Sequence, residues 1–278
     1  MIMESTEESP RHETGDHAEV ELDGVRMAFG DREVFRALSC RFPAGRISVI
    51  LGGSGSGKST LLRMVGGLVH PQTGRVTVAG NDITRLSEKQ MYDVRRSIGM
   101  MFQGGALLDS LTVFDNLAFP LREHTRKTEP EIADEVHRTL EAVGLRNVDD
   151  LLPRQLSGGM VKRVALARAI IMNPVILLCD EPFSGLDPIS SKRIEILLVG
   201  INRRSRMTIV MVSHNIASTM RIADQVVLLL PDGAVTGSPQ QLGASTDPRI
   251  ASFLTEDVDE SLVPPEEDLS TPPRIAAR

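Results

Sequence analysis

Side chains that could stack on nucleic-acid bases are scarce in this chain. Its 278 residues include no tryptophan and a single tyrosine, Tyr92, and the formal net charge is −6. Proteins that bind nucleic acid generally carry basic surfaces and aromatic platforms for the bases. The composition therefore argues against DNA or RNA as a partner.

Cysteines and long apolar segments are also scarce in this sequence. Cys40 and Cys179 are too few for the disulfide framework of a secreted domain, and Cys179 lies in an apolar strand pattern that favours a reduced thiol. The acidic N-terminus lacks the apolar core of a signal peptide, and no apolar run approaches the about 18 residues of a membrane span. We therefore expect a protein of a reducing compartment, which would act at a membrane only through a partner.

The chain does contain a glycine-rich loop between a predicted strand at 47–51 and a predicted helix that begins at Lys58. The loop fits G-x-x-x-x-G-K-[ST], a pattern in which backbone N–H groups and the positive end of the helix surround a phosphate chain. Lys58 is expected to reach the β- and γ-phosphates, and the Ser59 hydroxyl to bind Mg²⁺. The predicted nucleotide-binding residues are Gly52, Gly53, Ser54, Gly55, Ser56, Gly57, Lys58, Ser59 and Thr60.

Strand and helix patterns divide the chain into a central domain and two ends. Residues 1–18 are acidic and poor in apolar side chains, and residues 255–278 are acidic and rich in proline, so we expect both ends to be flexible. Residues 19–254 predict one α/β domain, in which residues 104–172 form an inserted helical lobe. Antiparallel strands near 20–22 and 34–38 would precede a mostly parallel sheet with strands at 47–51, 98–102, 175–179, 208–212 and 225–230.

Phe29 precedes a predicted turn at Gly30 and Asp31, ahead of the glycine-rich loop. An exposed phenylalanine at this turn could stack on an adenine ring, whereas a buried one would only fill the core. Both interpretations stay open at the level of the sequence.

Three of the predicted parallel strands end in residues suited to phosphate chemistry: Gln103, the pair Asp180 and Glu181, and His214. Open α/β sheets bind ligands at the carboxyl ends of their strands, and phosphoryl transfer needs positioned charge, a metal and an oriented water. We expect Asp180 to hold Mg²⁺ through water opposite Ser59, and Glu181 to act as general base toward the attacking water. His214 would contact the γ-phosphate and hold Glu181 in place. Gln103 would reach metal and water and report the nucleotide state to the helical lobe.

A second predicted helix N-terminus offers another anion site. It contains Ser157, Gly158, Gly159 and Met160. Its free N–H groups would favour a phosphate, yet the glycine-rich loop already surrounds one face of the chain's own nucleotide. The second site is therefore expected to serve the ATP of another molecule.

The order and spacing of these motifs over residues 19–243 resemble the nucleotide-binding subunits of ABC transporters. The resemblance implies a P-loop ATPase fold of the α/β class, with a mostly parallel core, an antiparallel β subdomain and an inserted helical subdomain. It also implies that two copies pair head to tail. Each signature, Ser157 to Met160, would then cap the γ-phosphate held by the partner copy, and Asp187 would lie at the interface between the two copies. ATP binding would close this dimer, and hydrolysis would release it.

Two features of the sequence point to a particular group of these subunits. Met160 stands where these subunits usually carry glutamine, and residues 102–125 are similar to those of the Mla- and Mce-type ATPases that power phospholipid movement across bacterial envelopes. That similarity implies an integral membrane permease, an MCE-domain substrate-binding protein and a small STAS-domain protein as partners. It implies a place on the cytoplasmic face of the inner membrane, attached through the permease. Gly53, where proline is usual, departs from the pattern.

Two other functions remain open from the sequence: an ATPase subunit of an importer for another solute, and a division-type ATPase that drives a membrane partner without transport. Residues 102–125 argue against the second. Residues 104–121 follow the nucleotide sensor Gln103 and combine a glycine pair with more apolar side chains than a small lobe is expected to bury. We expect a cytoplasmic helix of a permease to dock there, near Ala106, Leu107, Leu108, Phe114, Leu117 and Phe119.

Overall fold

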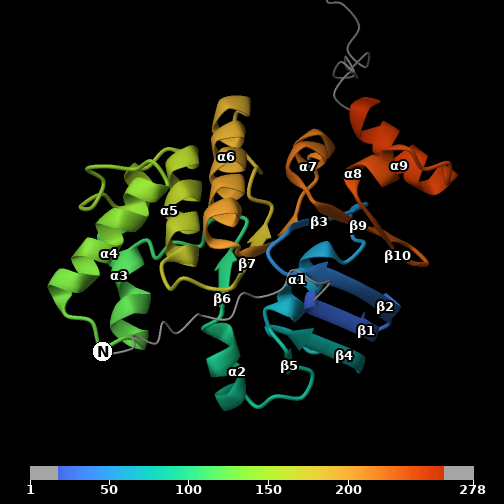
Figure 1. Ribbon diagram of the computed structural model, residues 1–278, viewed down its shortest axis with the longest axis horizontal. Helices are drawn as coiled ribbons and strands as arrows, with labels where there is room; N and C mark the ends of the chain where they lie inside the picture. Colours follow the sequence, from blue (N-terminus) through green and yellow to red (C-terminus); the bar gives the residue numbers. More distant parts are fainter. Residues whose placement is uncertain (1–17, 260–278) are drawn as a thin grey trace, which may run out of the picture.

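Residues 18–259 are described by the computed structural model, so the predicted flexible ends lie almost wholly outside the described residues. The described chain forms two sheets and a group of helices that extends from one side (Figure 1). The four-stranded sheet has the order β2-β1-β4-β5, and the six-stranded sheet the order β10-β9-β3-β8-β7-β6.

The four-stranded sheet is antiparallel, as the alternating pattern near the N-terminus predicts. Its two long strands each have 12 residues and are longer than predicted, because bulges in their pairing interrupt the simple alternation of apolar and polar residues. The strands are β1 (Ala18–Phe29), β2 (Arg32–Pro43), β4 (Thr73–Val78) and β5 (Asn81–Asp82).

The six-stranded sheet is parallel except for its edge strand β10 (Gly233–Gly237), which pairs antiparallel with β9. Its inner strands are almost completely buried, which explains why they form continuous apolar runs rather than an alternating pattern. The parallel strands are β3 (Ile47–Gly52), β6 (Ile98–Met101), β7 (Ile176–Asp180), β8 (Thr208–Val212) and β9 (Gln225–Leu230). Their carboxyl ends share one edge, so the loops that follow β3, β6, β7 and β8 converge there.

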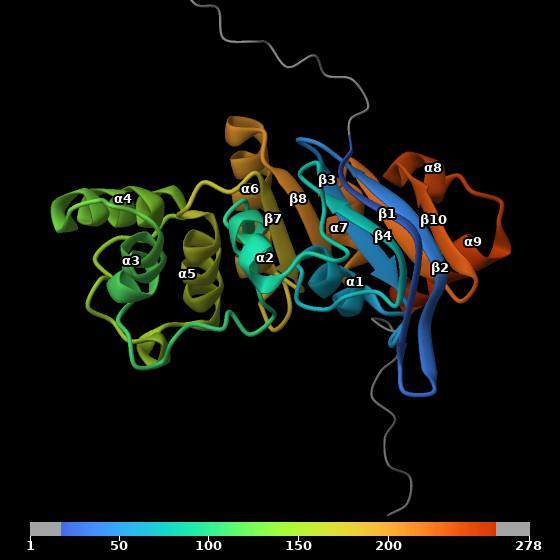
Figure 2. The ribbon, with the colours of Figure 1, turned by 90° about the horizontal axis from the view of Figure 1, so that it is seen from below.

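The helical lobe is built from three helices that share one apolar core with the nearby face of the parallel sheet (Figure 2). They are α3 (Val113–His124), α4 (Glu129–Ala142) and α5 (Gly158–Ile170). The predicted capping box at Thr128 is present, and Ser157 caps α5. The predicted helix starts are thus confirmed, and α5 ends two residues before the predicted end at Met172.

The remaining helices are α1 (Lys58–Val65), α2 (Glu88–Arg95), α6 (Pro188–Ser205), α7 (Ile216–Ile222), α8 (Pro239–Gly243), α9 (Pro248–Asp259) and the short 3₁₀ turn η1 (Pro153–Gln155). Helix α9 continues past Leu254, where the domain was expected to end, and the sequence patterns did not predict α8, α9 or β10. Among residues 18–259, no helix combines the length and apolar character needed to cross a membrane.

A buried carboxylate joins α6 to α7. The side chain of Glu195 is 2% exposed, and its Oε1 accepts hydrogen bonds from Ser218 Oγ and Arg221 Nη2, both at 2.6 Å. Its Oε2 accepts one from Lys192 Nζ at 2.9 Å. Burial alone would raise the pKa of Glu195, but hydrogen bonds from Arg221, Ser218 and Lys192 outweigh it and lower the pKa below 4.5. The ionised carboxylate therefore stabilises the packing of α7.

Glu195→Gln should lower the free energy of unfolding by about 2 kcal/mol at pH 7, since it weakens three charge-assisted hydrogen bonds while keeping the side-chain shape. A lowered pKa in the folded state stabilises the fold above the unfolded pKa, and that stability is lost as pH falls through the folded value. The difference between parent and variant should therefore shrink below pH 4.5 in urea titrations. Glu141→Gln, at an exposed ion pair, is the matched control. A constant difference across this pH range would contradict the assignment.

Candidate functional site

The glycine-rich loop has a backbone that only glycine adopts easily at two positions. Gly52 has a φ of +149°, and a Cβ there would lie 2.7 Å from Ser56 Oγ. Gly57 has a φ of +97°, and a Cβ there would lie 2.5 Å from Val34 Cγ1. At Gly53, by contrast, a Cβ would meet no described atom within 4 Å, and the φ lies outside the left-handed range. This position therefore does not require glycine.

Lys58 begins α1 and turns its ammonium back toward the loop. Its Nζ donates to the carbonyl oxygens of Gly52 at 2.7 Å and Gly53 at 3.0 Å. Burial lowers the pKa of Lys58, while the nearby carboxylates of Glu181 and Asp180 act in the opposite direction. The lysine is thus held at the loop where a phosphate chain would be bound.

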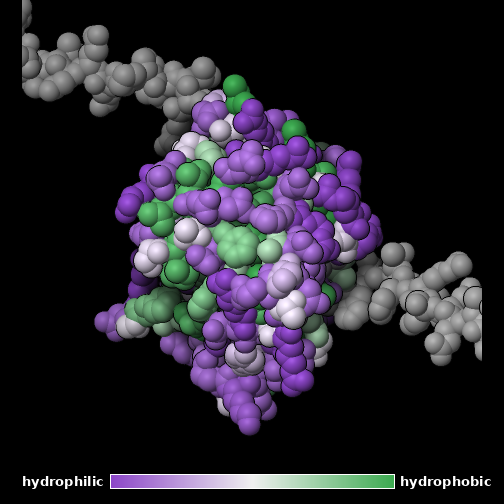
Figure 3. Space-filling view, turned by 90° about the vertical axis from the view of Figure 1, so that its left-hand side faces the viewer, coloured by the Kyte–Doolittle hydropathy of each residue, from purple (hydrophilic) through white to green (hydrophobic). Residues whose placement is uncertain are grey.

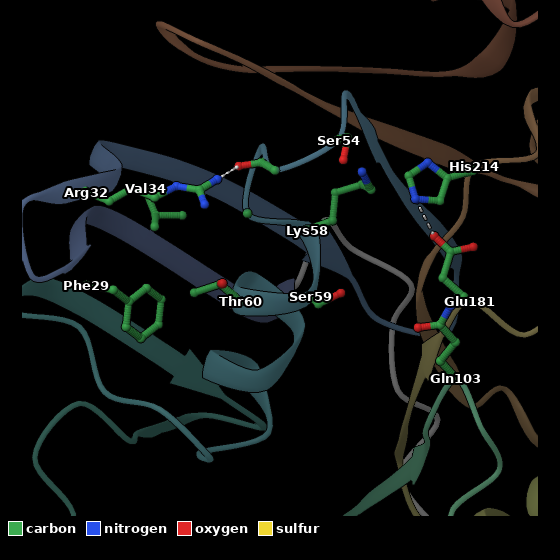
Figure 4. A pocket seen from close by; sticks show the side chains of 12 residues that line it. Phe29, Arg32, Val34, Ser54, Lys58, Ser59, Thr60, Gln103, Glu181 and His214 are labelled. Atoms are coloured by element: carbon green, nitrogen blue, oxygen red, sulfur yellow. Dashed lines mark hydrogen bonds and ion pairs between the residues drawn. The ribbon is translucent and has the colours of Figure 1, made fainter.

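A cavity of about 400 Å³ opens beside the loop. Phe29 lies at one end, Glu181, His214 and Gln103 lie at the other, and Lys58 and Ser59 lie between them (Figure 4). This order of residues suits a nucleotide with its base at the first end and its phosphates at the second. The lining residues are Phe29, Arg32, Val34, Ser54, Gly55, Gly57, Lys58, Ser59, Thr60, Gln103, Glu181 and His214.

Phe29 is 53% exposed and lines the cavity, so the alternative of a phenylalanine that only fills the core is wrong. Its stacking on adenine stays a prediction. Arg32 and Val34 also line the cavity, and sequence reasoning missed both. Arg32 Nη2 donates to the carbonyl oxygen of Gly55 at 3.1 Å and so ties β2 to the loop. The turn at Gly30 was visible in the sequence, but the reach of Arg32 to the loop depends on the tertiary fold.

Oxygen atoms that a magnesium ion favours lie at the end of the cavity near Ser59 and Gln103, although Asp180 itself is not among the described lining residues. Ser59 Oγ donates to Asp180 Oδ1 at 3.1 Å, and Gln103 faces the same space. Within residues 18–259, no group of three or more His, Cys, Asp or Glu side chains could hold a metal. These oxygens fit Mg²⁺ when phosphate and water oxygens complete its shell, and the bound ion would neutralise phosphate charge.

Glu181 follows β7 in a left-handed backbone conformation, with a φ of +49°. It is 9% exposed, and its Oε1 lies 3.0 Å from His214 Nε2. This oxygen makes no well-aligned hydrogen bond within the described residues, so the contact with His214 is an ion pair only when the imidazole is protonated. Burial raises the pKa of Glu181, against the opposing effect of His214. A raised pKa brings the carboxylate closer to the value of an effective general base at neutral pH.

None of the four signature residues, Ser157 to Met160, is among the described residues that line this cavity. Ser157 Oγ accepts a hydrogen bond from Met160 N at 3.3 Å at the start of α5. Asp187 caps α6, accepting from Ile189 N at 2.9 Å and Ser190 N at 3.0 Å. Ser190 Oγ lies 3.0 Å from where a Cβ on Gly159 would be, so the two helix starts are neighbours.

Comparisons with known proteins agree with this geometry. A family model described as ABC transporter matches residues 35–184. The intermembrane phospholipid transport system ATP-binding protein MlaF of Haemophilus influenzae is 41% identical over 241 residues, covering 86% of this chain and 91% of that protein. MlaF of Escherichia coli K12 is 42% identical, with 84% and 88% covered. The probable ribonucleotide transport ATP-binding protein mkl of Mycobacterium tuberculosis is 41% identical, with 84% and 66% covered.

Solved structures give the same fold. A dimeric, post-hydrolysis structure of the ATP-binding cassette MJ0796 bound to ADP and Pi matches with a TM-score of 0.73 and 29% identity, covering 79% of this chain and 98% of that one. The structure of cbiO1 from Clostridium perfringens, part of an ABC transporter complex, matches with a TM-score of 0.75 and 27% identity, with 88% and 98% covered. The chain therefore belongs to the ABC transporter family, as an ATP-binding subunit with ATPase activity.

Proposed function

We propose that this chain is the ATP-hydrolysing subunit of a bacterial transporter that moves phospholipids between envelope membranes. The observation that carries the proposal is its likeness to the MlaF proteins along nearly the whole of both chains. Likeness to mkl is equally strong in identity but spans about two thirds of that protein, which is named for ribonucleotide transport. An importer of another solute is therefore the second candidate.

Two copies of the chain would share their ATP sites head to tail. In this arrangement Lys58 and the loop hold the phosphates, Ser59, Asp180 and Gln103 hold Mg²⁺, and Glu181 takes a proton from the attacking water. His214 orients Glu181 and contacts the γ-phosphate. The partner's signature helix, begun by Ser157, caps that phosphate from the open side of the cavity. The absence of the signature residues from the lining of the chain's own cavity and the dimeric relative with ADP and Pi support this arrangement.

The chain would work with an integral membrane permease on the cytoplasmic face of the inner membrane. An MCE-domain protein and a small STAS-domain protein would complete the transporter. The permease is the partner that the lobe surface supports best. Figure 3 shows the side of the molecule formed by the lobe, where apolar side chains gather among polar ones.

The apolar residues of the 104–121 segment divide into two groups. Leu117 is fully buried, and Leu107 and Phe114 pack against the core, so these three help to fill the lobe. Leu108 is 44% exposed and Phe119 is 49% exposed. Leu108 lies five residues after Gln103, which lines the ATP cavity. A permease helix on Leu108 would thus sense the nucleotide through a short segment.

Leu108→Glu should release the permease while the ATPase stays folded, because a charge buried at an interface costs several kcal/mol and an exposed one costs little. The measurement is co-purification of the two proteins from detergent-solubilised membranes, with thermal unfolding of the isolated subunit as a check of folding. Ile196→Glu, at an exposed isoleucine of α6, is the matched control and should keep the permease. Equal recovery of permease with both variants would place the docking surface elsewhere.

The choice between the two candidates can be tested on the assembled complex. If phospholipid is the substrate, ATP hydrolysis by the complex should respond to phospholipid supplied in mixed micelles and should be indifferent to ribonucleotides other than ATP. Stimulation by such a ribonucleotide, with no response to phospholipid, would replace the lipid assignment by the importer.

A further inference from the structure

A buried lysine on the signature helix is left without a role by the chemistry described above. Lys162 lies in the first turns of α5, three residues after Gly159, and is 6% exposed. A lysine ammonium carries three N–H donors, and burial is costly unless they are satisfied. Something in the fold must therefore compensate this charge.

The Lys162 ammonium joins three separate segments. Its Nζ donates to the main-chain carbonyl of Gln103, to the main-chain carbonyl of Glu181 at 3.1 Å and to Ser184 Oγ at 3.3 Å. Gln103 follows β6, Glu181 follows β7 and Ser184 lies in the turn before α6. In both views α5 lies between the other lobe helices and the parallel sheet (Figures 1 and 2). From this place the Lys162 side chain bonds to all three segments.

The contact with Glu181 bears on a strained position. Glu181 has a φ of +49°, which a glutamate adopts only when its surroundings hold it there. Its carbonyl accepts from Lys162 Nζ, from Ser184 Oγ at 3.1 Å and from Ser184 N at 3.2 Å. Lys162 thus helps to fix the backbone that aims the Glu181 carboxylate at the chain's own cavity.

The start of the same helix, about one turn before Lys162, faces a different place. Residues Ser157 to Met160 begin α5 and do not line the cavity of their own chain within the described structure, whereas Gln103 and Glu181 do. A single rigid helix turn therefore connects two groups at one ATP site with the signature that would complete the other.

We propose that Lys162 is a positioning residue that couples the two ATP sites of the dimer. It does so by linking Gln103 and Glu181 of one site to the signature helix that caps the nucleotide of the other. This inference rests on the head-to-tail dimer of the proposed function. A change at the γ-phosphate that moves Gln103 or Glu181 is passed to α5 through the ammonium, and a change at the signature is passed back.

The test uses dimers with one active site, assembled with the permease from two differently tagged copies. One copy carries Lys58→Ala, so the active site combines the P-loop of the other copy with the signature of the Lys58→Ala copy. Lys162→Met, which keeps the apolar stem and removes the donors, is then placed on either copy. Both placements should lower kcat on the order of tenfold with little change in KM, because each misplaces a group at the active site.

Arg163→Met is the matched control on the next residue of α5. Arg163 Nη1 donates to the carbonyl of Gly144 at 2.8 Å and its Nε to that of Gly159 at 3.3 Å, and neither bond reaches the segments of Gln103 or Glu181. Arg163→Met should therefore lower kcat only when it is placed on the copy that supplies the signature. Lys162→Arg, which keeps charge and donors, should recover part of the activity.

The outcomes separate this inference from the dimer on which it rests. Ser157→Arg on the copy that supplies the signature serves as the benchmark. If it has no effect on kcat, both the shared site and the coupling are wrong. If the benchmark holds, a loss from Lys162→Met on one copy only would reduce the residue to a support for one site. If Lys162→Met lowers kcat on neither copy, or if Arg163→Met lowers kcat equally on both copies, the role of Lys162 would be ordinary helix packing. Each of these results overturns the coupling role.

Discussion

Glu181→Gln should bind ATP about as tightly as the parent and hydrolyse it at least about a hundredfold more slowly. The amide keeps the shape of the side chain and its place 3.0 Å from His214, but it cannot accept a proton from water. Because hydrolysis would open the proposed dimer, ATP-loaded dimers of the variant should accumulate. The measurements are steady-state turnover, equilibrium ATP binding and the dimer fraction by size-exclusion chromatography with ATP.

Glu141→Gln is the control for this result, since Glu141 pairs with Arg146 on the exposed face of the lobe, outside the cavity lining. It should leave turnover unchanged. Near-parent turnover in Glu181→Gln would mean that another group activates the water. Loss of ATP binding, in turn, would mean that Glu181 serves to build the cavity.

Ser157→Arg and Lys58→Ala should complement each other when they lie on different copies of the dimer. Ser157→Arg places a bulky cation at the helix start that should meet the partner's γ-phosphate, and Lys58→Ala removes the contact that Lys58 is expected to make with the bound phosphates. Each homodimer should be inactive. A mixed dimer with one variant on each copy retains one intact site, made of the first copy's P-loop and the second copy's signature. It should recover up to about half of the parent activity.

The arrangement of the two substitutions decides between shared and independent sites. With both substitutions on one copy and a wild-type partner, a head-to-tail dimer has no intact site, so turnover should stay near zero. If each chain used its own signature, the pattern would reverse, and the wild-type partner would keep its activity. Co-expression of differently tagged copies, followed by two affinity steps, isolates each mixed dimer for the assay.

The positions of the parallel strands were predictable because buried strands leave a continuous apolar run, as at Ile176–Asp180 and Thr208–Val212. The residues that follow such strands could then be placed together at one edge of the sheet. Helix starts at Thr128 and Ser157 were predictable from capping residues. The short strand β10 and the helices α8 and α9 lack comparably strong patterns, and tertiary contacts decide their structure.

Other features depended on contacts between distant segments. Phe29 fitted the core and the cavity equally well until its exposed fraction was known. Leu117 and Leu108 are both apolar residues of the same segment, yet one is buried and the other is exposed. Lys162 was missed because a lysine on a helix is usually solvated, and only the fold brings three acceptors to its ammonium.

The central claim is that ATP hydrolysed at this cavity moves phospholipid. The direct measurement is transfer of a labelled phospholipid from liposomes that contain the whole transporter to acceptor membranes, with the parent chain and with Glu181→Gln. With the parent chain, extraction of the labelled phospholipid or its transfer to the acceptor membranes should depend on ATP. With Glu181→Gln it should stop. ATP hydrolysis by the complete complex with phospholipid movement no faster than in Glu181→Gln would contradict the claim.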